Sequence, residues 1–308
     1  MTSIACIGRG DDDDIDSSEP HHQFNSGADE KVLHVFDAPT STLRSYCALS
    51  GKCESSLVAS ACKAWNNVAS AAIRLSDVKR GKRVQILKGG HRSTVSTMSF
   101  SRNGKYLASS GKDRRICIWR RRIHDQSMSN PDEFTSGYEL SAAADSAHKR
   151  IIWSIHFCPK SPDILASGSR DGLIKIWRVV EAIDGALELK QLVRFEPSFK
   201  KAKTPITAVA FAEDLFCGIY DNNIECGILS IGTECGRIEI WAIPIFSPVH
   251  NYGIEYPSPK LLHTLPANDT HFDTVNKIAW RPGMTSVEAF NPIFASCGRD
   301  SGVRIYNL

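Results

Sequence analysis

The chain has 308 residues, of which 42% are hydrophobic and 23% are charged. These proportions are close to globular averages, so they exclude a disordered, collagen-like or coiled-coil chain. The formal net charge of +3, from 37 basic and 34 acidic side chains, is too small to indicate a dedicated nucleic-acid binder. No stretch approaches the length of an apolar membrane span, and the apolar run before Arg9 is too short for a secretion signal, so we expect a soluble, intracellular protein.

The ten cysteines are scattered, and no pair has the C-x-x-C spacing of a metal or redox site. Two of them, Cys117 and Cys297, lie inside apolar runs that are typical of strands. We therefore expect buried, reduced thiols and a cytoplasmic protein, with the nucleus as a second compartment. The acidic run from Asp11 to Asp14 lacks the glycine-bearing loop of a calcium site, so we expect a solvated loop and no metal there.

A thirteen-residue segment recurs along the chain. Each copy begins with small and apolar residues, continues with a polar turn and ends in an alternating apolar run with a terminal aromatic residue, a pattern that predicts a β-hairpin. In chain order the copies are Phe24–Phe36, Leu107–Trp119, Leu165–Trp177, Leu229–Trp241 and Phe294–Tyr306, and a degenerate unit covers Leu57–Leu75. This repetition indicates a repeat architecture.

A further strand is predicted before four of these hairpins, and a histidine precedes it in three of them. His91 precedes the run at 94–100, His148 the run at 151–157 and His271 the run at 275–280, whereas the run at 206–211 has no histidine. The other residues are predicted to form loops rich in Pro, Gly, Ser or charge, at 120–147, 179–203, 213–225, 243–269 and 282–291. Long insertions of this kind commonly carry partner contacts.

The order of histidine, three strands, turn aspartate and terminal aromatic residue resembles the WD-repeat family, whose fold is an all-β propeller of four-stranded blades. In that family the histidine, a strand Ser or Thr, the aspartate and the tryptophan form a hydrogen-bonded network in each blade. The resemblance assigns to this network His91, Asp113, Trp119, His148, Asp171, Trp177, His271 and Asp300. The propellers of the family that this chain resembles have seven blades. In this chain we expect about five to six recognisable repeats and therefore an incomplete propeller.

Two copies depart from the family pattern. Cys235 stands at the aspartate position of one copy and Glu30 at that of another, so we expect a broken network in the first and less tightly specified blades in both. Charged residues inside the strands are expected to run their stems along a neighbouring sheet; these are Lys175, Glu239 and Arg304.

Four segments, at 26–39, 57–64, 148–154 and 294–300, resemble the family of WD-repeat proteins that forms the second subunit of Elongator. That resemblance implies two consecutive propellers, with residues 1–40 as a remnant of the last blade of the first, 41–54 as a shortened linker and 55–308 as the second. We interpret the sequence as a partial form of the family pattern. Incomplete ring closure would leave strand edges that favour association.

The resemblance implies a non-catalytic scaffold that holds the first and third Elongator subunits in a complex that modifies the wobble uridine of tRNA, without a cofactor or a small-molecule substrate. The residues themselves agree, because the sequence has no nucleotide-binding glycine loop, zinc-ligand spacing or nucleophile elbow. Ser, His and Asp recur at matching positions in successive copies, as structural networks do, whereas a catalytic triad needs one unique constellation.

Clusters of basic residues are the candidates for a weak contact with tRNA or with an acidic partner. Turns of neighbouring blades can emerge on one face and combine into a positive surface; otherwise these charges are solvated and serve solubility. The candidates are Lys79, Arg80, Lys82, Arg83, Arg114, Arg115, Arg120, Arg121, Arg122, Lys149 and Arg150.

Other functions stay open at this point. A generic WD-repeat adaptor, such as a substrate receptor of a ubiquitin ligase, would share the fold, although the Trp119-Arg120 and Trp177-Arg178 junctions lack the Trp-Asp-x-Arg box that such receptors often carry. A propeller that binds RNA directly is a second alternative, and an enzyme is the least favoured.

Overall fold

A computed structural model describes residues 24–26, 31–33, 43–48, 57–62, 72–77, 82–123, 136–198, 204–216, 224–245, 256–281 and 292–307. This part of the chain consists of strands and turns and contains no helix. Accordingly, no helix in it is long and apolar enough to cross a membrane.

The strands form five antiparallel sheets and a separate short hairpin, in which β1 (Phe24–Ser26) pairs with β2 (Lys31–Leu33). Sheet 1 contains β3 (Leu43–Ala48), β4 (Leu57–Cys62), β5 (Ile73–Asp77) and β6 (Lys82–Leu87). Sheet 2 contains β7 (Val95–Phe100), β8 (Tyr106–Gly111), β9 (Ile116–Ile123) and β10 (Ser136–Ala144). Sheet 3 contains β11 (Ile152–Phe157), β12 (Ile164–Ser169), β13 (Ile174–Glu181) and β14 (Leu187–Phe195). Sheet 4 contains β15 (Ile206–Phe216), β16 (Glu225–Thr233), β17 (Ile238–Ile245) and β18 (Lys260–Thr264). Sheet 5 contains β19 (Val275–Trp280), β20 (Ile293–Gly298) and β21 (Val303–Asn307).

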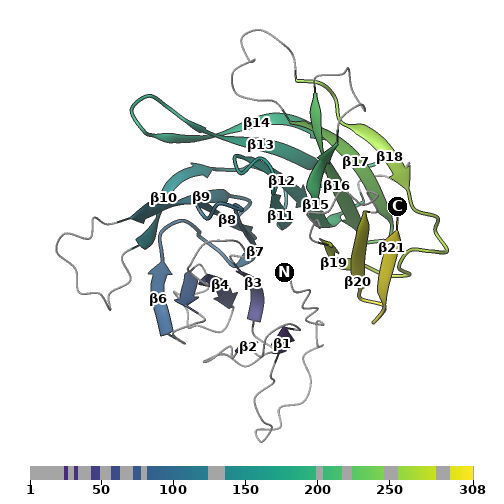
Figure 1. Ribbon diagram of the computed structural model, residues 1–308, viewed down its shortest axis with the longest axis horizontal. Helices are drawn as coiled ribbons and strands as arrows, with labels where there is room; N and C mark the ends of the chain where they lie inside the picture. Colours follow the sequence, from purple (N-terminus) through teal and green to yellow (C-terminus); the bar gives the residue numbers. More distant parts are fainter. Residues whose placement is uncertain are drawn as a thin grey trace, which may run out of the picture.

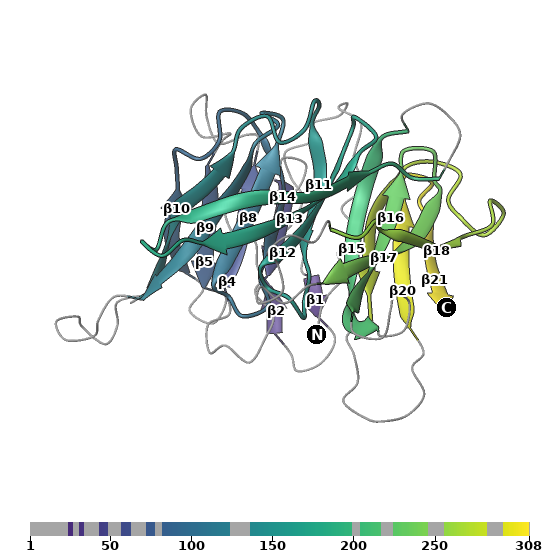
Figure 2. The same ribbon diagram turned by 90° about the horizontal axis from the view of Figure 1, so that it is seen from above.

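The sheets follow one another around a common centre, with the first strand of each sheet nearest to it (Figure 1). Seen from the side, they stand next to one another like the blades of a propeller (Figure 2). Contacts between β3 and β7, β7 and β11, β11 and β15, and β15 and β19 link neighbouring sheets. With four complete blades and a three-stranded fifth sheet, the described residues form an incomplete β-propeller.

The predicted hairpins coincide with the second and third strands of sheets 2 to 5. The first and last residues of each thirteen-residue copy are register partners: Leu107 faces Trp119, Leu165 faces Trp177, Leu229 faces Trp241 and Phe294 faces Tyr306. The first strand of every sheet also carries an irregularity near its start, including sheet 1, where the sequence repeat is degenerate. Sheet 1 is therefore built on the same plan as the others.

The outermost strands are where the structure departs from the sequence prediction. β10, β14 and β18 all lie in stretches predicted as loops, so the surplus length between the hairpins partly forms the fourth strand of each blade. Within the segment 41–54, predicted as a linker, Leu43–Ala48 forms β3 and pairs with β4. The division into an upstream remnant and a second propeller otherwise stays a prediction.

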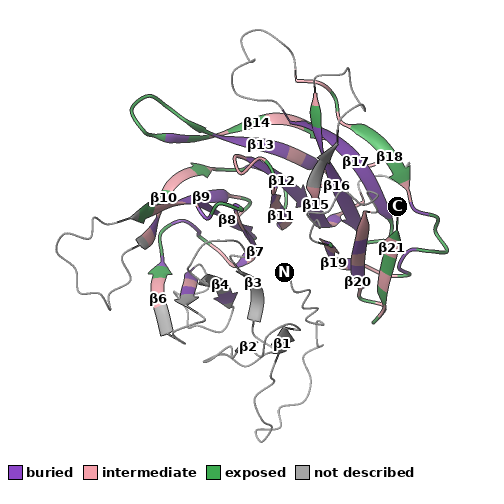
Figure 3. Ribbon diagram, in the orientation of Figure 1, coloured by how far each residue is buried: buried purple, intermediate pink, exposed green. Residues whose placement is uncertain are grey.

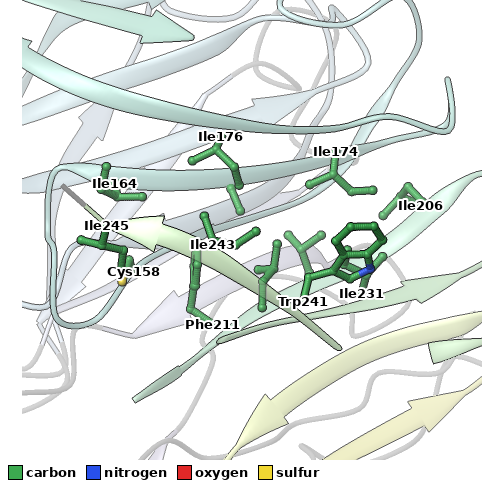
Figure 4. Close-up of a cluster of buried hydrophobic side chains, with 13 residues drawn as sticks. Cys158, Ile164, Ile174, Ile176, Ile206, Phe211, Ile231, Trp241, Ile243 and Ile245 are labelled. Atoms are coloured by element: carbon green, nitrogen blue, oxygen red, sulfur yellow. The ribbon is translucent and has the colours of Figure 1, made fainter. Parts of the chain in front are cut away.

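Neighbouring sheets bury their facing sides against each other. Ile174 and Ile176 of β13 pack with Ile206 and Phe211 of β15 between sheets 3 and 4 (Figure 4). Similar apolar clusters fill the spaces between sheets 1 and 2, 2 and 3, and 4 and 5. The second and third strands of sheets 2 to 4 are buried along most of their length (Figure 3). Burial of one aliphatic side chain of this kind contributes about 1.5 to 3 kcal/mol.

Small residues in the second strand set the distance between sheets. A Cβ on Gly168 of β12 would lie 2.6 Å from the Cγ2 of Ile206 in the next sheet. At Gly232 of β16 it would lie 2.6 Å from the Cγ1 of Val275, again in the next sheet. The glycines, together with Ala and Ser at neighbouring positions, let the next sheet approach closely.

The first strands are linked through side chains instead of a backbone ladder. Ser96 Oγ donates to Ile152 O at 2.6 Å, and Ser99 Oγ accepts from the backbone N–H of Phe157 at 3.1 Å. The same device links β11 to β15, where Ser154 Oγ accepts from Val209 N at 3.1 Å. Hydroxyl groups thus satisfy backbone groups along the inner strand edges, which would otherwise be left without partners.

The cysteines follow the expectation in part. Cys117, Cys158 and Cys226 are buried and not disulfide-bonded, and burial raises the pKa of the Cys117 thiol to about 12, so this thiol is inert at neutral pH. Cys235 is free but exposed. Cys297 is disulfide-bonded, so the expectation of a reduced thiol is wrong for this residue.

Candidate functional site

The turns emerge at two ends of the sheets. Because adjacent strands are antiparallel, the connections β6–β7, β8–β9, β10–β11 and β12–β13 share one end. The hydrogen bonds from Ser96 to Ile152 and from Phe157 to Ser99 follow β7 and β11 in the same direction, so sheets 2 and 3 present this end on the same side. We call it the His–Asp face, because His91, Asp113, His148 and Asp171 lie there, and we call the other end the opposite face.

The structure brings His91, Asp113 and Trp119 together in sheet 2. His91 Nδ1 lies 2.9 Å from Asp113 Oδ2, and His91 Nε2 lies 2.7 Å from Ser109 Oγ. Trp119 Nε1 donates to the same Ser109 Oγ at 2.8 Å. The backbone N–H of Arg92 donates to the Asp113 carboxylate at 3.0 Å, which fixes the turn before β7.

Sheet 3 repeats this network with His148, Asp171 and Trp177. His148 Nδ1 lies 3.1 Å from Asp171 Oδ2, and Ser167 Oγ lies 2.8 Å from both His148 Nε2 and Trp177 Nε1. The backbone N–H groups of Lys149 and Leu173 donate to Asp171 at 2.8 and 3.1 Å. One tautomer satisfies every group: the indole donates to the serine, the serine to Nε2, and Nδ1–H to the carboxylate.

Burial and hydrogen bonding move the pKa values of this pair. Burial is the largest influence on His148 and lowers its pKa, while the bond to Asp171 opposes this shift only in part, so the imidazole is neutral at pH 7. Burial alone would raise the pKa of Asp171, but the donors His148, Lys149 and Leu173 outweigh it and lower the pKa to about 2. The pKa of Asp113 is lowered for the same reasons, since the donors there also outweigh burial.

Sheet 5 contains a variant of the network around His271 and Asp300. His271 Nδ1 lies 2.8 Å from Asp300 Oδ1, and His271 Nε2 lies 2.7 Å from Ser296 Oγ. Tyr306 replaces the tryptophan and donates its hydroxyl to Asp269 O at 2.9 Å. Arg304 Nη1 adds a bond to Asp300 Oδ2 at 2.9 Å, and the pKa of Asp300 is lowered because its hydrogen-bond donors, Arg304 first, outweigh the effect of burial.

In sheet 4 a different residue accepts the hydrogen bond of the tryptophan indole. Cys235 stands at the aspartate position, and Ile231 occupies the place of the serine, so Trp241 loses its usual partner. Glu239 accepts from Trp241 Nε1 at 2.8 Å and from the backbone N–H of Ser198 at 3.1 Å. The expectation that Glu239 only runs its stem along a neighbouring sheet is wrong, because this residue is 0% exposed and is the acceptor for the tryptophan N–H.

These side chains are of the types found in a catalytic triad, but their hydrogen-bonding groups are already occupied by structural contacts. Ser109 and Ser167 each hold an indole N–H and a histidine ring at once, and each aspartate accepts backbone N–H groups of two turns. The contact between histidine and serine recurs at matching positions of sheets 2, 3 and 5. Among the described residues there is also no group of three or more His, Cys, Asp or Glu side chains that could hold a metal ion.

The basic candidates separate into two populations. On the His–Asp face, Arg114, Lys149 and Arg150 are exposed, and neither they nor their exposed neighbours are ion-paired within the described residues; the neighbours are Arg92, Lys112 and Arg170. Asp113 and Asp171 are held in the networks and Asp145 pairs with Arg115 at 2.5 Å, so the exposed Glu196, which follows β14, is the acid that these contacts leave at this end of sheets 2 and 3 in the described part of the chain. This end of sheets 2 and 3 is therefore cationic.

The opposite face is balanced by ion pairs. Arg120 Nη2 lies 2.7 Å from Glu181 Oε1, Lys105 Nζ lies 2.9 Å from Glu181 Oε2, and Arg122 pairs with Glu139. Arg121, the middle member of the cluster, is half-buried in β9. The structure thus does not combine the cluster Arg120–Arg122 with Arg114, Lys149 and Arg150.

The remaining candidates lie before sheet 2. Lys79 and Arg80 lie outside the described residues. Lys82 and Arg83 begin β6 at the end of sheet 1 away from the β6–β7 turn, so their backbone is at the opposite face.

The sequence analysis did not identify several residues that the structure places in the networks or on the cationic face. It expected a strand Ser or Thr in the network but did not identify Ser109, Ser167 and Ser296, which the constant spacing of four residues before each aspartate could have located. It also missed Glu239 as an indole partner, for which the isolated acid between two isoleucines was a weak signal. The exposed Arg170 was missed because it stands alone in the sequence.

Replacing Ser167 with alanine should destabilise the protein. The change leaves Trp177 Nε1 and His148 Nε2 buried without their shared partner, which costs about 1 to 3 kcal/mol. Urea unfolding followed by tryptophan fluorescence measures the loss. The matched control is Ser141→Ala, because the Ser141 hydroxyl donates a long hydrogen bond of 3.3 Å to Glu139 O and its removal should change the free energy of unfolding by less than about 0.5 kcal/mol. Equal effects of both substitutions would contradict the network.

Acid should weaken the fold through Asp171. Its pKa of about 2 in the folded state is below its usual value of 3.8, so the unfolded chain takes up the proton first. The stability that this group supplies is present above about pH 4 and is lost as the pH falls towards 2. Asp171→Asn should lower the free energy of unfolding at pH 7 and flatten its dependence on pH between 4 and 2.5 in urea titrations. Asp184→Asn, in the exposed β13–β14 turn, is the control, and an unchanged slope in Asp171→Asn would refute this assignment.

Known proteins show the same repeat. The family described as "WD domain, G-beta repeat" matches residues 81–120 and 142–178. The chain is 34% identical over 276 residues to Elongator complex protein 2 of Drosophila melanogaster, and 29% identical over 263 residues to the protein of that name from Schizosaccharomyces pombe. Each match covers 85% of this chain but only 29% of the relative. The human protein of that name is 37% identical over 141 residues, which are 44% of this chain and 16% of the relative. The chain thus contains segments that match WD repeats, its described residues fold as an incomplete β-propeller, and its sequence is similar to that of Elongator complex protein 2.

Proposed function

We propose that the chain acts as a non-catalytic scaffold of the Elongator complex and contributes to the modification of the wobble uridine of tRNA. Its similarity to proteins named Elongator complex protein 2, along 85% of its length, supports this proposal. The proposed partners are the first and third subunits of the complex. The proposed compartment is the cytoplasm, with the nucleus as a second one.

The observation that best supports a scaffold role is that the Ser, His and Asp side chains of the networks are all engaged in structural hydrogen bonds. In sheets 2 and 3 the serine binds the tryptophan indole and the histidine ring, and the aspartate accepts backbone N–H groups of the turns. Each network therefore fixes the turns of its sheet. Turns that are fixed in this way form a surface that is already ordered before a partner arrives. Binding to such a surface costs little conformational entropy, which suits a subunit whose task is to position other proteins.

Affinity purification tests the scaffold proposal. The tagged full chain, expressed in cells and treated with nuclease, should retain the first and third Elongator subunits in mass spectrometry. The tag alone is the control. Recovery of a cullin adaptor instead would favour a ubiquitin-ligase receptor, and recovery of neither would refute the proposed partners.

A direct contact with RNA is the second candidate function, and the unpaired cations of the His–Asp face favour it. Arg114, Lys149 and Arg150 are exposed, and the aspartates of the same turns, Asp113, Asp145 and Asp171, are committed to other groups. An exposed cation without an ion pair binds phosphate more favourably than an ion-paired one, because no internal ion pair has to be broken. The ion-paired arginines of the opposite face fit this role less well.

Charge reversal on the two faces separates these surfaces. The double variant Lys149→Glu and Arg150→Glu should weaken tRNA binding and reduce the slope of log K against log salt by roughly 0.7 to 0.9 for each phosphate that the protein no longer neutralises. The double variant Arg120→Glu and Arg122→Glu carries the same change of charge and should leave the slope almost unchanged. Filter binding from 50 to 200 mM salt measures both. A larger effect on the opposite face would reject the proposed surface.

A further inference from the structure

One turn of the His–Asp face has a strained backbone. Arg114 follows the network aspartate in the β8–β9 turn and has a φ of 64°. In this left-handed region the Cβ of an L-residue lies too close to the following carbonyl oxygen, whereas glycine has no Cβ and adopts the conformation freely. At the same position sheet 3 has Gly172, with a φ of 80°, and sheet 4 has Gly236, with a φ of 83°. Sheet 2 therefore carries an arginine where its neighbours carry the residue that suits the turn.

The turn, and not the arginine, determines this conformation. The backbone N–H of Arg114 donates to the carbonyl oxygen three residues earlier at 3.2 Å, and Gly172 and Gly236 make the same bond at 3.1 and 3.2 Å. The carboxylate of Asp113 also accepts the backbone N–H of Arg115 at 3.2 Å. These bonds hold the backbone of the turn whatever side chain follows the aspartate, so an arginine at this position makes the fold less stable than a glycine would.

The side chain of Arg114 makes no contact that offsets the strain. Its guanidinium is exposed and has no hydrogen bond or ion pair within the described residues. Arg115 shows the contrast, because its side chain pairs with Asp145 at 2.5 Å and donates to Gly90 O at 2.6 Å. Arg115 therefore joins neighbouring segments of the fold, whereas Arg114 lowers the stability and leaves its charge unused. Strain of this kind is typical of positions that contact a ligand.

The surroundings of Arg114 are cationic. The ion pair of Arg115 with Asp145 joins the β8–β9 turn to the turn before β11, and that second turn carries the exposed Lys149 and Arg150. Three exposed cations from two adjoining turns therefore lie at the junction of sheets 2 and 3. Such a junction favours an anionic ligand.

Large exposed apolar side chains of sheets 2 and 3 lie elsewhere. Leu140 is in the middle of β10, and Val180 and Ile183 are near the β13–β14 turn at the opposite face. A protein interface is centred on apolar and aromatic side chains, whereas a nucleic-acid backbone is bound mainly by cations. The composition of the junction therefore favours the phosphates of RNA over an acidic protein segment.

We propose that Arg114 binds a phosphate group of an RNA backbone, a role that rests on the RNA contact proposed for the His–Asp face. Its planar guanidinium can donate two parallel hydrogen bonds to the phosphate oxygens. Lys149 and Arg150 neutralise neighbouring phosphates. Sheet 2 thus gives up stability at one turn and presents there a cation on a backbone that is fixed before the RNA arrives.

Two glycine substitutions separate the backbone strain from the charge. Arg114→Gly should raise the equilibrium constant for folding about threefold, because relief of the strain outweighs the freedom of glycine in the unfolded chain. It should also weaken tRNA binding about tenfold, because a charge-assisted contact is lost. Ser301→Gly is the matched control, since Ser301 follows the network aspartate of sheet 5 with a φ of 58°. This variant should be stabilised to the same degree and should bind tRNA within about twofold of the unchanged chain. Urea unfolding followed by tryptophan fluorescence measures the first effect, and filter binding measures the second.

A polyglutamate chain distinguishes phosphate from carboxylate ligands. Arg114→Gly should change its binding by less than about twofold, because salt screens a general attraction between exposed charges. An equal loss of tRNA and polyglutamate binding would overturn the proposal, and so would a less stable Arg114→Gly variant or an equal loss of tRNA binding in Ser301→Gly. If Lys149→Glu with Arg150→Glu weakens tRNA binding and Arg114→Gly does not, the role of Arg114 is refuted while the RNA contact stands. If the unchanged chain binds no tRNA, both are refuted.

Discussion

Face-to-face burial of successive sheets is the constraint on which the rest of the structure depends. Ile116 and Ile118 of β9, like their equivalents in β13 and β17, are 0 to 2% exposed because the next sheet covers them. At the matching positions of β21, Val303 is 65% exposed and Ile305 is 74% exposed. These positions carry β-branched aliphatic residues in all four sheets, so the difference arises from the neighbour and not from the strand itself. Each blade is therefore complete only as part of the series.

The polar network depends on this packing and does not replace it. Sheet 4 has neither the histidine nor the serine nor the aspartate, yet β16 and β17 are buried almost throughout. What cannot be omitted is a partner for the buried indole of Trp241, and Glu239 supplies it from the same strand. The requirement that persists is satisfaction of a buried N–H group, whereas the residue that meets it can change.

The hairpins of sheets 2 to 5 were predictable because several local signals coincide in thirteen residues. A turn aspartate, alternating isoleucines and a terminal aromatic residue at fixed distances leave one register, as the pairing of Leu165 with Trp177 illustrates. The fourth strands were not predictable in this way. β18 is exposed along most of its length, so it has no apolar periodicity to distinguish it from a loop, and its pairing with β17 is a tertiary effect.

The basic clusters show the same limit for the candidate site. In sequence, Arg114-Arg115 and Arg120–Arg122 are close together, but one strand separates them, so they lie at opposite ends of sheet 2. Their surroundings depend on residues that are distant in sequence, such as Glu181 for Arg120 and Asp145 for Arg115. Sequence proximity therefore overestimated the cluster, and charge pairing could be assigned only in three dimensions.

The stabilising network also determines the charge of the two faces. Asp113 and Asp171 fix their turns only when they are ionised and buried against histidine and backbone donors. Carboxylates that are used in this way cannot neutralise the exposed cations of the same turns, such as Lys112 and Arg170. On the opposite face the turns need no such network, and Glu139 and Glu181 remain available to arginine and lysine. A repeat that fixes its turns with buried aspartates therefore produces one cationic end and one balanced end.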